Sequence, residues 1–154
     1  AASISKHFIN NSNSVGLAGN DSREFILPPG SGDRQLSYIF EYLASCTSDG
    51  GRPIKSMLLQ DISRVSRQAG IVIITSSDSE GITAATNYLS ARNAPGAIIS
   101  IDLESFRSSN VDNPKIKESQ HTNIPNYSVR KGDDLSKALS FTYSRPPIKA
   151  RFGN

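Results

Sequence analysis

The chain has 154 residues, of which 36% are apolar and 20% charged, and this size and composition predict one globular domain with a buried core. Its 17 basic and 14 acidic residues give a net charge of +3, and the excess of basic residues lies only near the C-terminus, which argues against a nucleic-acid-binding protein. Cys46 is the single cysteine, so an internal disulfide and a zinc site built on paired cysteines are excluded.

The first predicted elements are a helix and a β-hairpin. Residues 1–11 place apolar side chains at helical spacing. Residues 14–19 and 23–27 are short apolar runs separated by polar turn residues, which predicts two antiparallel strands. Residues 28–32 contain two prolines and two glycines, and we predict a loop there because proline lacks an amide donor.

Two amphipathic helices are predicted next. Residues 34–46 form the first, with Asp33 as its N-cap and Cys46 as a small buried residue at its end. Pro53 opens the second helix, which continues through residue 67. The buried stripe of the first helix is predicted to consist of Leu36, Ile39, Phe40 and Leu43.

The middle of the chain predicts a parallel sheet. Residues 70–75 are a continuous apolar, mostly β-branched run, typical of a central strand that is covered on both faces. A polar loop then leads into a helix that ends near Arg92, and residues 97–101 form a second buried strand. Strand, helix and strand in this order predict a parallel crossover.

The C-terminal third is less regular. Residues 105–123 are polar and without period, which predicts a surface excursion with no site. Residues 127–129 predict a short strand, followed by a capped turn and a helix over 135–139. The domain is therefore predicted to span residues 1–143, with a basic, proline-containing tail or linker at 144–154. The whole pattern predicts an α/β fold of three layers, a mostly parallel sheet flanked by helices.

Several short motifs follow one another in an order that covers most of the chain. They are Val15-Gly16-Leu17, Leu27-Pro28-Pro29-Gly30, Gly50-Gly51, Val72-Ile73-Ile74-Thr75, Ile99-Ser100-Ile101-Asp102 and the stretch from Tyr127 to Leu135. In this order they resemble the C-terminal portion of the domain that defines the bacterial family called domain of unknown function 58. The resemblance implies a von Willebrand factor A-like, Rossmann-like fold whose first central strand would precede Ala1. We therefore expect an exposed sheet edge that either pairs with a second copy or leaves a gap in the sheet.

The same resemblance implies a divalent-metal site built by three loops, and this sequence departs from its pattern. The ligands of the first loop would lie upstream of Ala1. Arg52 follows the glycine pair where the pattern has threonine, and a guanidinium cannot ligate a cation. Asp78 is displaced from Thr75 toward the next helix, where a helix cap is the simpler role. No metal or other cofactor is therefore predicted for this chain, and Mg²⁺ or Mn²⁺ only for a full-length protein.

The function predicted is that of a protein-protein interaction module, in which Arg52 pairs with a carboxylate of the partner. The alternative is a metal-dependent adhesion module whose main ligands lie upstream and to which this chain adds Ser77 or Asp78. A remote alternative, an enzyme, lacks a nucleophile and base, because His7 and His121 have no such motif nearby. The candidate partner-binding residues are Arg52, Thr75, Ser76, Ser77 and Asp78.

The resemblance also implies a cellular setting. It predicts a soluble, cytoplasmic part of a bacterial membrane-associated protein, with a protein partner in an AAA-type ATPase system. No apolar run is long enough to span a membrane and no signal peptide is visible, so this part requires no membrane contact. The expected exposed sheet edge makes a homo-oligomer a further possibility.

Overall fold

The structure is a computed structural model, and it describes all residues except 23, 61–64, 67, 94, 108–123 and 140–154. Helices and strands alternate over most of the chain. In order they are α1 (Ala2–Asn10), β1 (Val15–Asn20), β2 (Glu24–Gly30), α2 (Gly32–Ser45), α3 (Ile54–Gln60), β3 (Ile71–Thr75), α4 (Ser79–Arg92), β4 (Gly96–Ile101), α5 (Leu103–Arg107), β5 (Asn126–Val129) and α6 (Leu135–Ala138).

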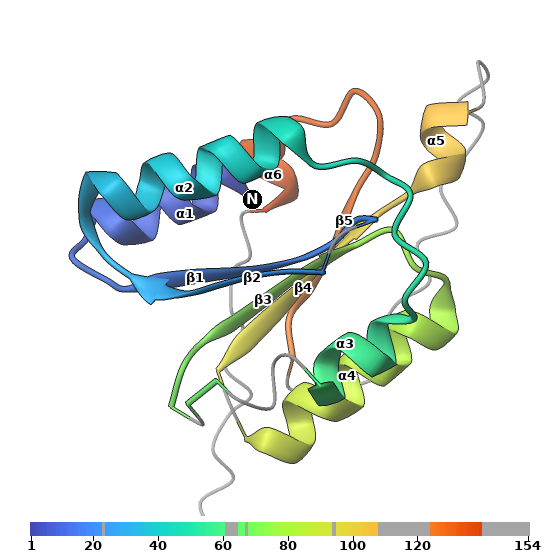
Figure 1. Cartoon of the computed structure of the whole chain (residues 1–154). Coiled ribbons are helices and arrows are strands. Elements are labelled where there is room, and N and C mark those ends of the chain that lie inside the picture. The colour runs from blue at the N-terminus through green and yellow to red at the C-terminus, as the bar shows by residue number, and fades with distance from the viewer. Residues whose placement is uncertain (23, 61–64, 67, 94, 108–123, 140–154) are drawn as a thin grey trace, which may run out of the picture.

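The strands form a central layer between two layers of helices. Figure 1 shows α1, α2 and α6 on one side of the strands, with α3 and α4 on the other. The strands make two sheets, an antiparallel pair β1-β2 and a parallel sheet in the order β3-β4-β5. The predicted α/β class is confirmed as a three-stranded parallel sheet flanked by helices, an arrangement compatible with a Rossmann-like fold.

The predicted hairpin is present, but its second strand is longer than expected. Leu17 pairs with Leu27 and Asn20 with Glu24, yet β2 continues through Pro28 and Pro29, which were predicted to lie in a loop. Among the described strands β2 pairs only with β1, so its outer side requires no amide donors. The register shifts opposite Gly16, which lies so close to the β2 backbone that a Cβ there would be 2.9 Å from the Leu27 carbonyl oxygen.

Helix α2 packs on the hairpin through a face slightly rotated from the predicted one. Ile39 is fully buried as expected, but Phe40 is 40% exposed and Tyr42 is buried. The Tyr42 ring stacks on that of Phe25 in β2, with centroids 3.8 Å apart, and the space it fills exists because residue 19 is a glycine. Tyr42 therefore belongs to the inner face of α2 together with Ile39.

Both predictions for the ends of α2 are wrong. The helix begins at Gly32, so Asp33 lies inside its first turn rather than at the N-cap, which is Ser31. Cys46 follows the last helical residue and is exposed rather than buried, because the backbone turns extended there. The Asp33 carboxylate still lies at the positive end of the helix dipole.

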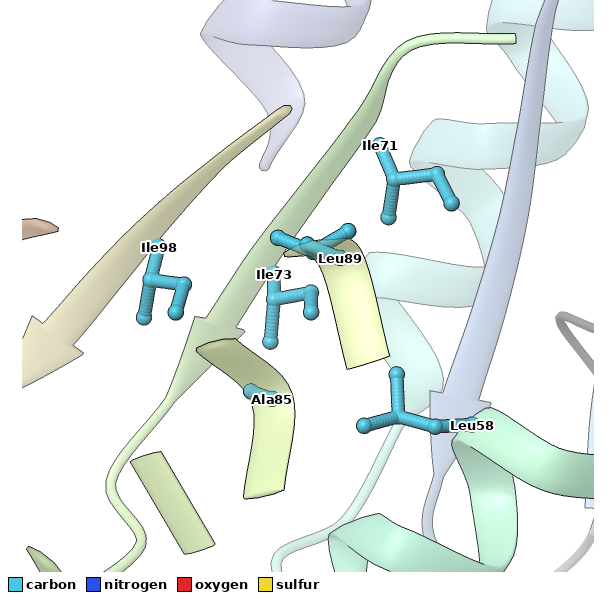
Figure 2. Packing of buried hydrophobic residues seen from close by; sticks show 6 residues of the cluster. All are labelled: Leu58, Ile71, Ile73, Ala85, Leu89 and Ile98. Carbon is cyan, nitrogen blue, oxygen red and sulfur yellow. The ribbon is translucent and has the colours of Figure 1, made fainter. Parts of the chain in front are cut away.

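The core lies between the parallel sheet and the α3–α4 layer. Figure 2 shows the six cluster residues, which come from both helices and from β3 and β4. They are Leu58, Ile71, Ile73, Ala85, Leu89 and Ile98, each at most 7% exposed. Gly96 allows β4 to approach Leu89 closely, since a Cβ there would be 3.3 Å from both Leu89 methyl carbons. This cluster joins the α3–α4 layer to the parallel sheet.

Strand β3 is buried on one face and half-exposed on the other, contrary to the prediction. Ile71 and Ile73 are 7% exposed, whereas Val72 and Ile74 are each 41% exposed. Side chains alternate between the two faces of a strand, so the exposed pair points away from α4. The continuous apolar run predicted burial of both faces of β3, but the packing of the helices fully buries only the face that contains Ile71 and Ile73.

The C-terminal elements agree with the prediction at β5 and α6, where Asp134 caps the helix by accepting from the Ser136 amide at 2.9 Å. Helix α5 was not predicted, and it takes up the first residues of the segment assigned to a polar excursion. The rest of that excursion and the predicted tail lie outside the described residues. Across the described residues, no helix has the length and apolar character to cross a membrane.

Candidate functional site

The carboxyl ends of the parallel strands are the expected location of a site in an open α/β sheet. In Figure 1, β1, β3 and β4 run in the same direction, and the connection from α2 to α3 crosses at the edge where they end. Arg52 lies in this connection, and Thr75 is the last residue of β3. The predicted candidates therefore belong to two loops at one edge of the central layer.

Arg52 is bound to the hairpin. Its Nη1 lies 3.1 Å from Glu24 Oε1, and its side chain is 22% exposed. The Asn20 side-chain amide donates to the Arg52 carbonyl oxygen at 2.9 Å. The guanidinium expected to meet a carboxylate of a partner thus already meets one of its own chain.

Asp49 ties the same connection to the hairpin. Its Oδ1 accepts from the Ser22 amide at 3.1 Å and from the Thr47 hydroxyl. The Thr47 hydrogen bond is the main cause that lowers the pKa of this carboxyl below its ordinary value, because it stabilises the charged form. Asp49 is therefore a structural group that holds the connection from α2 to α3 against the hairpin.

The second loop is organised by its own hydrogen bonds. Thr75 Oγ1 accepts from the Ser77 amide at 3.0 Å and lies 2.8 Å from Ser77 Oγ. Asp78 Oδ1 accepts from the Gly81 amide at 3.0 Å, so its predicted role as the N-cap of α4 is confirmed. Ser76 is exposed between them. The residues of this loop shape the start of α4.

The two loops meet at the first turn of α4. A Cβ on Gly81 would lie 2.5 Å from Ser77 Cβ and 3.2 Å from Ile54 Cγ2, so Ser77 and the start of α3 both lie against this glycine. Ile54 is two residues after Arg52. The structure thus joins the segments that contain the candidates through packing at Gly81.

Asp78→Ala is expected to lower the free energy of unfolding by about 1 kcal/mol, since the Gly81 amide loses its acceptor. Urea unfolding followed by circular dichroism measures the change. Glu80→Ala is the matched control, because Glu80 lies in the same first turn and does not cap the helix. Equal losses for both variants would contradict the capping role.

A polar cluster that the sequence analysis missed joins the ends of β4 and β5. Asp102 Oδ2 accepts from Arg130 Nε at 3.1 Å, and Asp102 Oδ1 accepts from the amide of Ser105 at 3.3 Å. Ser105 Oγ donates to the Asp102 carbonyl oxygen at 2.7 Å and accepts from the Lys131 amide at 2.9 Å. Arg130 is thus the ion-pair partner of Asp102. The position of both charged residues directly after a strand was the available signal.

Two further features bear on chemistry. A shallow hollow of about 480 Å³ lies between β2 and α2, and the stacked Phe25 and Tyr42 form part of its wall together with Glu24 and Glu41. His7 lies on α1 beside the edge of the Phe8 ring, while His121 lies outside the described residues. Within the described ranges, no three His, Cys, Asp or Glu side chains are grouped so that they could hold a metal ion.

The inner edges of the two sheets are the other notable feature of the central layer. Figures 1 and 2 both show β1 and β3 side by side and running in the same direction. β1 pairs only with β2, and β3 only with β4, among the strands that the structure describes. We call these two facing edges the β1–β3 seam.

The unpaired groups of β3 can be assigned to residues. The Ile71 amide donates toward β4, to the Pro95 carbonyl oxygen at 2.9 Å. Backbone groups alternate in direction along a strand, so the amides and carbonyls of Val72 and Ile74 point away from β4, toward the seam. These are the same two residues whose side chains are 41% exposed. Within the described part of the chain, backbone groups without a strand partner and half-exposed apolar side chains therefore coincide at these two residues.

Comparisons of the chain with protein-family models, with curated proteins and with solved structures find no match. The resemblance to the domain of unknown function 58 family and the von Willebrand factor A-like assignment therefore stay predictions.

Proposed function

We propose that this chain is a protein-protein interaction module that binds an extended segment of a partner along the β1–β3 seam. The observation that carries the proposal is a coincidence at Val72 and Ile74, where backbone groups that no other described strand pairs accompany half-exposed apolar side chains. Backbone edges recognise a strand by main-chain hydrogen bonds, and neighbouring side chains add specificity.

The seam supports this function better than the candidate loops do. Arg52 is paired with Glu24, and Thr75, Ser77 and Asp78 bond within their own loop. These loops lie at the end of the seam and would position a bound segment rather than hold it. Arg52 stands where the resemblance implies a metal-binding threonine, which favours protein binding over the metal-dependent adhesion alternative.

The wider setting is part of the same proposal. We assign the chain to the domain of unknown function 58 family on the order of its motifs, with a von Willebrand factor A-like fold. The protein would then act as a non-enzymatic part of a bacterial membrane-associated protein, on its cytoplasmic side, with a partner in an AAA-type ATPase system.

The test starts from a displayed library of random peptides, from which peptides that bind the whole chain are selected. Their affinities for two variants of the chain are then compared with their affinity for the wild type. Ile74→Lys places a charge at the seam, and Phe106→Lys is the matched control, because Phe106 is similarly exposed but lies on α5. We expect the selected peptides to lose about ten- to a hundredfold in affinity for Ile74→Lys and to keep it for Phe106→Lys.

Hydrogen exchange of the wild-type protein provides a readout that needs no variant. On peptide binding, the amides of Val72 and Ile74 are expected to exchange more slowly, since they gain acceptors. If the selected peptides bind both variants equally and leave these two amides unchanged, the seam is not the binding surface and the proposal fails.

A further inference from the structure

We infer that the hollow between β2 and α2 binds an arginine side chain of a partner polypeptide. The inference goes beyond the proposed function and does not depend on it, because every described residue that lines the hollow belongs to β2 or α2 and none to the strands of the seam. It follows from three properties of the hollow, namely its aromatic wall, its charge and its shape.

The wall of the hollow is largely aromatic and apolar. On α2, Tyr38 is 41% exposed, and Tyr42 lies four residues further along the same face of the helix. On β2, Phe25 and Leu27 share one face of the strand, and the Phe25 ring stacks on that of Tyr42. Aromatic rings attract cations, and the flat guanidinium group of arginine also stacks on them. The wall therefore suits an arginine side chain.

The chain itself shows two ways in which this wall meets a guanidinium. Arg34 lies over the Tyr38 ring, with its Cζ 5.6 Å from the ring centroid, and its Nε donates to the Tyr38 hydroxyl at 2.9 Å. Arg52 Nη1 lies 3.1 Å from Glu24 Oε1. One contact uses a ring and the other a carboxylate, so the hollow offers both kinds of group that recognise arginine.

The charge of the lining is negative. Glu24 and Glu41 line the hollow, and no basic residue is among the described residues that do. Glu24 is shared with Arg52, whereas the exposed Glu41 carboxylate has no hydrogen bond or ion pair within the part of the chain that the structure describes. The whole chain has a net charge of +3, so attraction of a basic partner must come from these local carboxylates. Glu41 is therefore the acceptor available to an incoming guanidinium.

The shape of the hollow indicates a polypeptide rather than a free small molecule. Its volume of about 480 Å³ is large enough for a side chain, but the hollow is shallow. Sites for small molecules enclose most of the surface of their ligand. A polypeptide can place one side chain in a shallow site and gain the rest of its affinity from the surrounding surface.

Labelled peptides of equal length test the inference. One has arginines separated by serines and glycines, and a second has citrulline at the same positions, which keeps the shape of arginine and lacks its charge. A third has lysine there. Fluorescence anisotropy measures their affinities for the whole chain. We expect the arginine peptide to bind about tenfold more tightly than the citrulline peptide and about two- to fivefold more tightly than the lysine peptide.

Variants of the chain locate the binding. Glu41→Gln removes the charge and keeps the size of the side chain, and we expect it to weaken binding of the arginine peptide about tenfold. Glu80→Gln is the matched control, because Glu80 is also exposed but lies on α4, and this variant should bind as the wild type does. Tyr38→Leu keeps an apolar wall without the ring, and a loss of about two- to fivefold is expected. Circular dichroism confirms that the variants fold.

Nuclear magnetic resonance of the wild-type chain gives a readout that needs no variant. On addition of the arginine peptide, the backbone amide signals of Glu41 and Ser45 are expected to shift, while that of Glu80 stays in place. Both observed residues line the hollow or lie far from it as the structure describes. Shifts at Glu80 without shifts at Glu41 would place the binding elsewhere and overturn the inference.

The remaining outcomes each support or overturn one part of the inference. Equal affinities of the arginine and citrulline peptides, or equal losses for the two glutamate variants, would show that the hollow is not a cation site. Equal affinities of the arginine and lysine peptides would overturn the preference for a guanidinium. If free methylguanidinium bound as tightly as the arginine peptide, the occupant would be a small molecule and not a polypeptide. None of these results depends on Val72 or Ile74, so the seam and the hollow are tested separately.

Discussion

Leu58→Ala is expected to lower the free energy of unfolding by about 2–5 kcal/mol, whereas the same change at the next residue should have little effect. Leu58 is 2% exposed and joins α3 to the core under β3, so its truncation leaves a cavity that the cluster cannot readily fill. Leu59 is 57% exposed on the same helix, and Leu59→Ala should change the free energy by no more than about 0.5 kcal/mol.

Urea unfolding followed by circular dichroism checks this pair, since both variants share the substitution, the helix and the change in helix propensity. The difference between them therefore isolates burial. Similar losses of unfolding free energy for the two variants would mean that Leu58 is not buried and that α3 does not pack on β3.

Gly50→Ala is expected to destabilise the protein by about 1–3 kcal/mol, because the added methyl group meets backbone that cannot move aside. A Cβ on Gly50 would lie 2.0 Å from the Asn20 carbonyl oxygen at the end of β1. The connection from α2 to α3 would have to move away from the hairpin. The hydrogen bond from Asn20 to the Arg52 carbonyl and the ion pair of Arg52 with Glu24 would weaken together.

Gly51→Ala is the matched control for this prediction. A Cβ on Gly51 meets nothing within 4 Å, so the variant should be as stable as the wild type or up to about 1 kcal/mol more stable, through its less flexible unfolded chain. Thermal and urea unfolding of both variants measure their stabilities relative to the wild type. A Gly50→Ala variant as stable as Gly51→Ala would show that the connection does not lie against β1.

The order of the elements other than α5 could be predicted because each of them has a local signal. The apolar runs of β3 and β4, the helical spacing between them and the capping Asp78 each depend on residues close in the chain. The continuation of β2 through Pro28 and Pro29 was missed because proline normally ends a strand, and only an edge position permits it.

The candidate site was harder to predict because its properties depend on residues far apart in the chain. Arg52 pairs with Glu24, and Arg130 pairs with Asp102. The two residues of each pair are far apart in the chain, so no local sequence pattern indicates the contact. The sequence of β3 shows that Val72 is apolar, but only the packing of the helices shows which face of the strand stays exposed. An exposed sheet edge was expected from the resemblance, whereas the residues that form it come from the structure.

The prolines of β2 have a consequence for assembly. Strands that present open edges on both sides of a molecule can add copies without limit, and proteins restrict such growth with prolines and short strands. Among the described strands, the outer one on the hairpin side contains Pro28 and Pro29, and the outer one of the parallel sheet, β5, has only four residues. A molecule whose seam is filled would therefore offer poor templates at both ends of its central layer. Binding of the partner strand would make the assembly finite, and a bound complex should stay monodisperse at concentrations where the free chain aggregates.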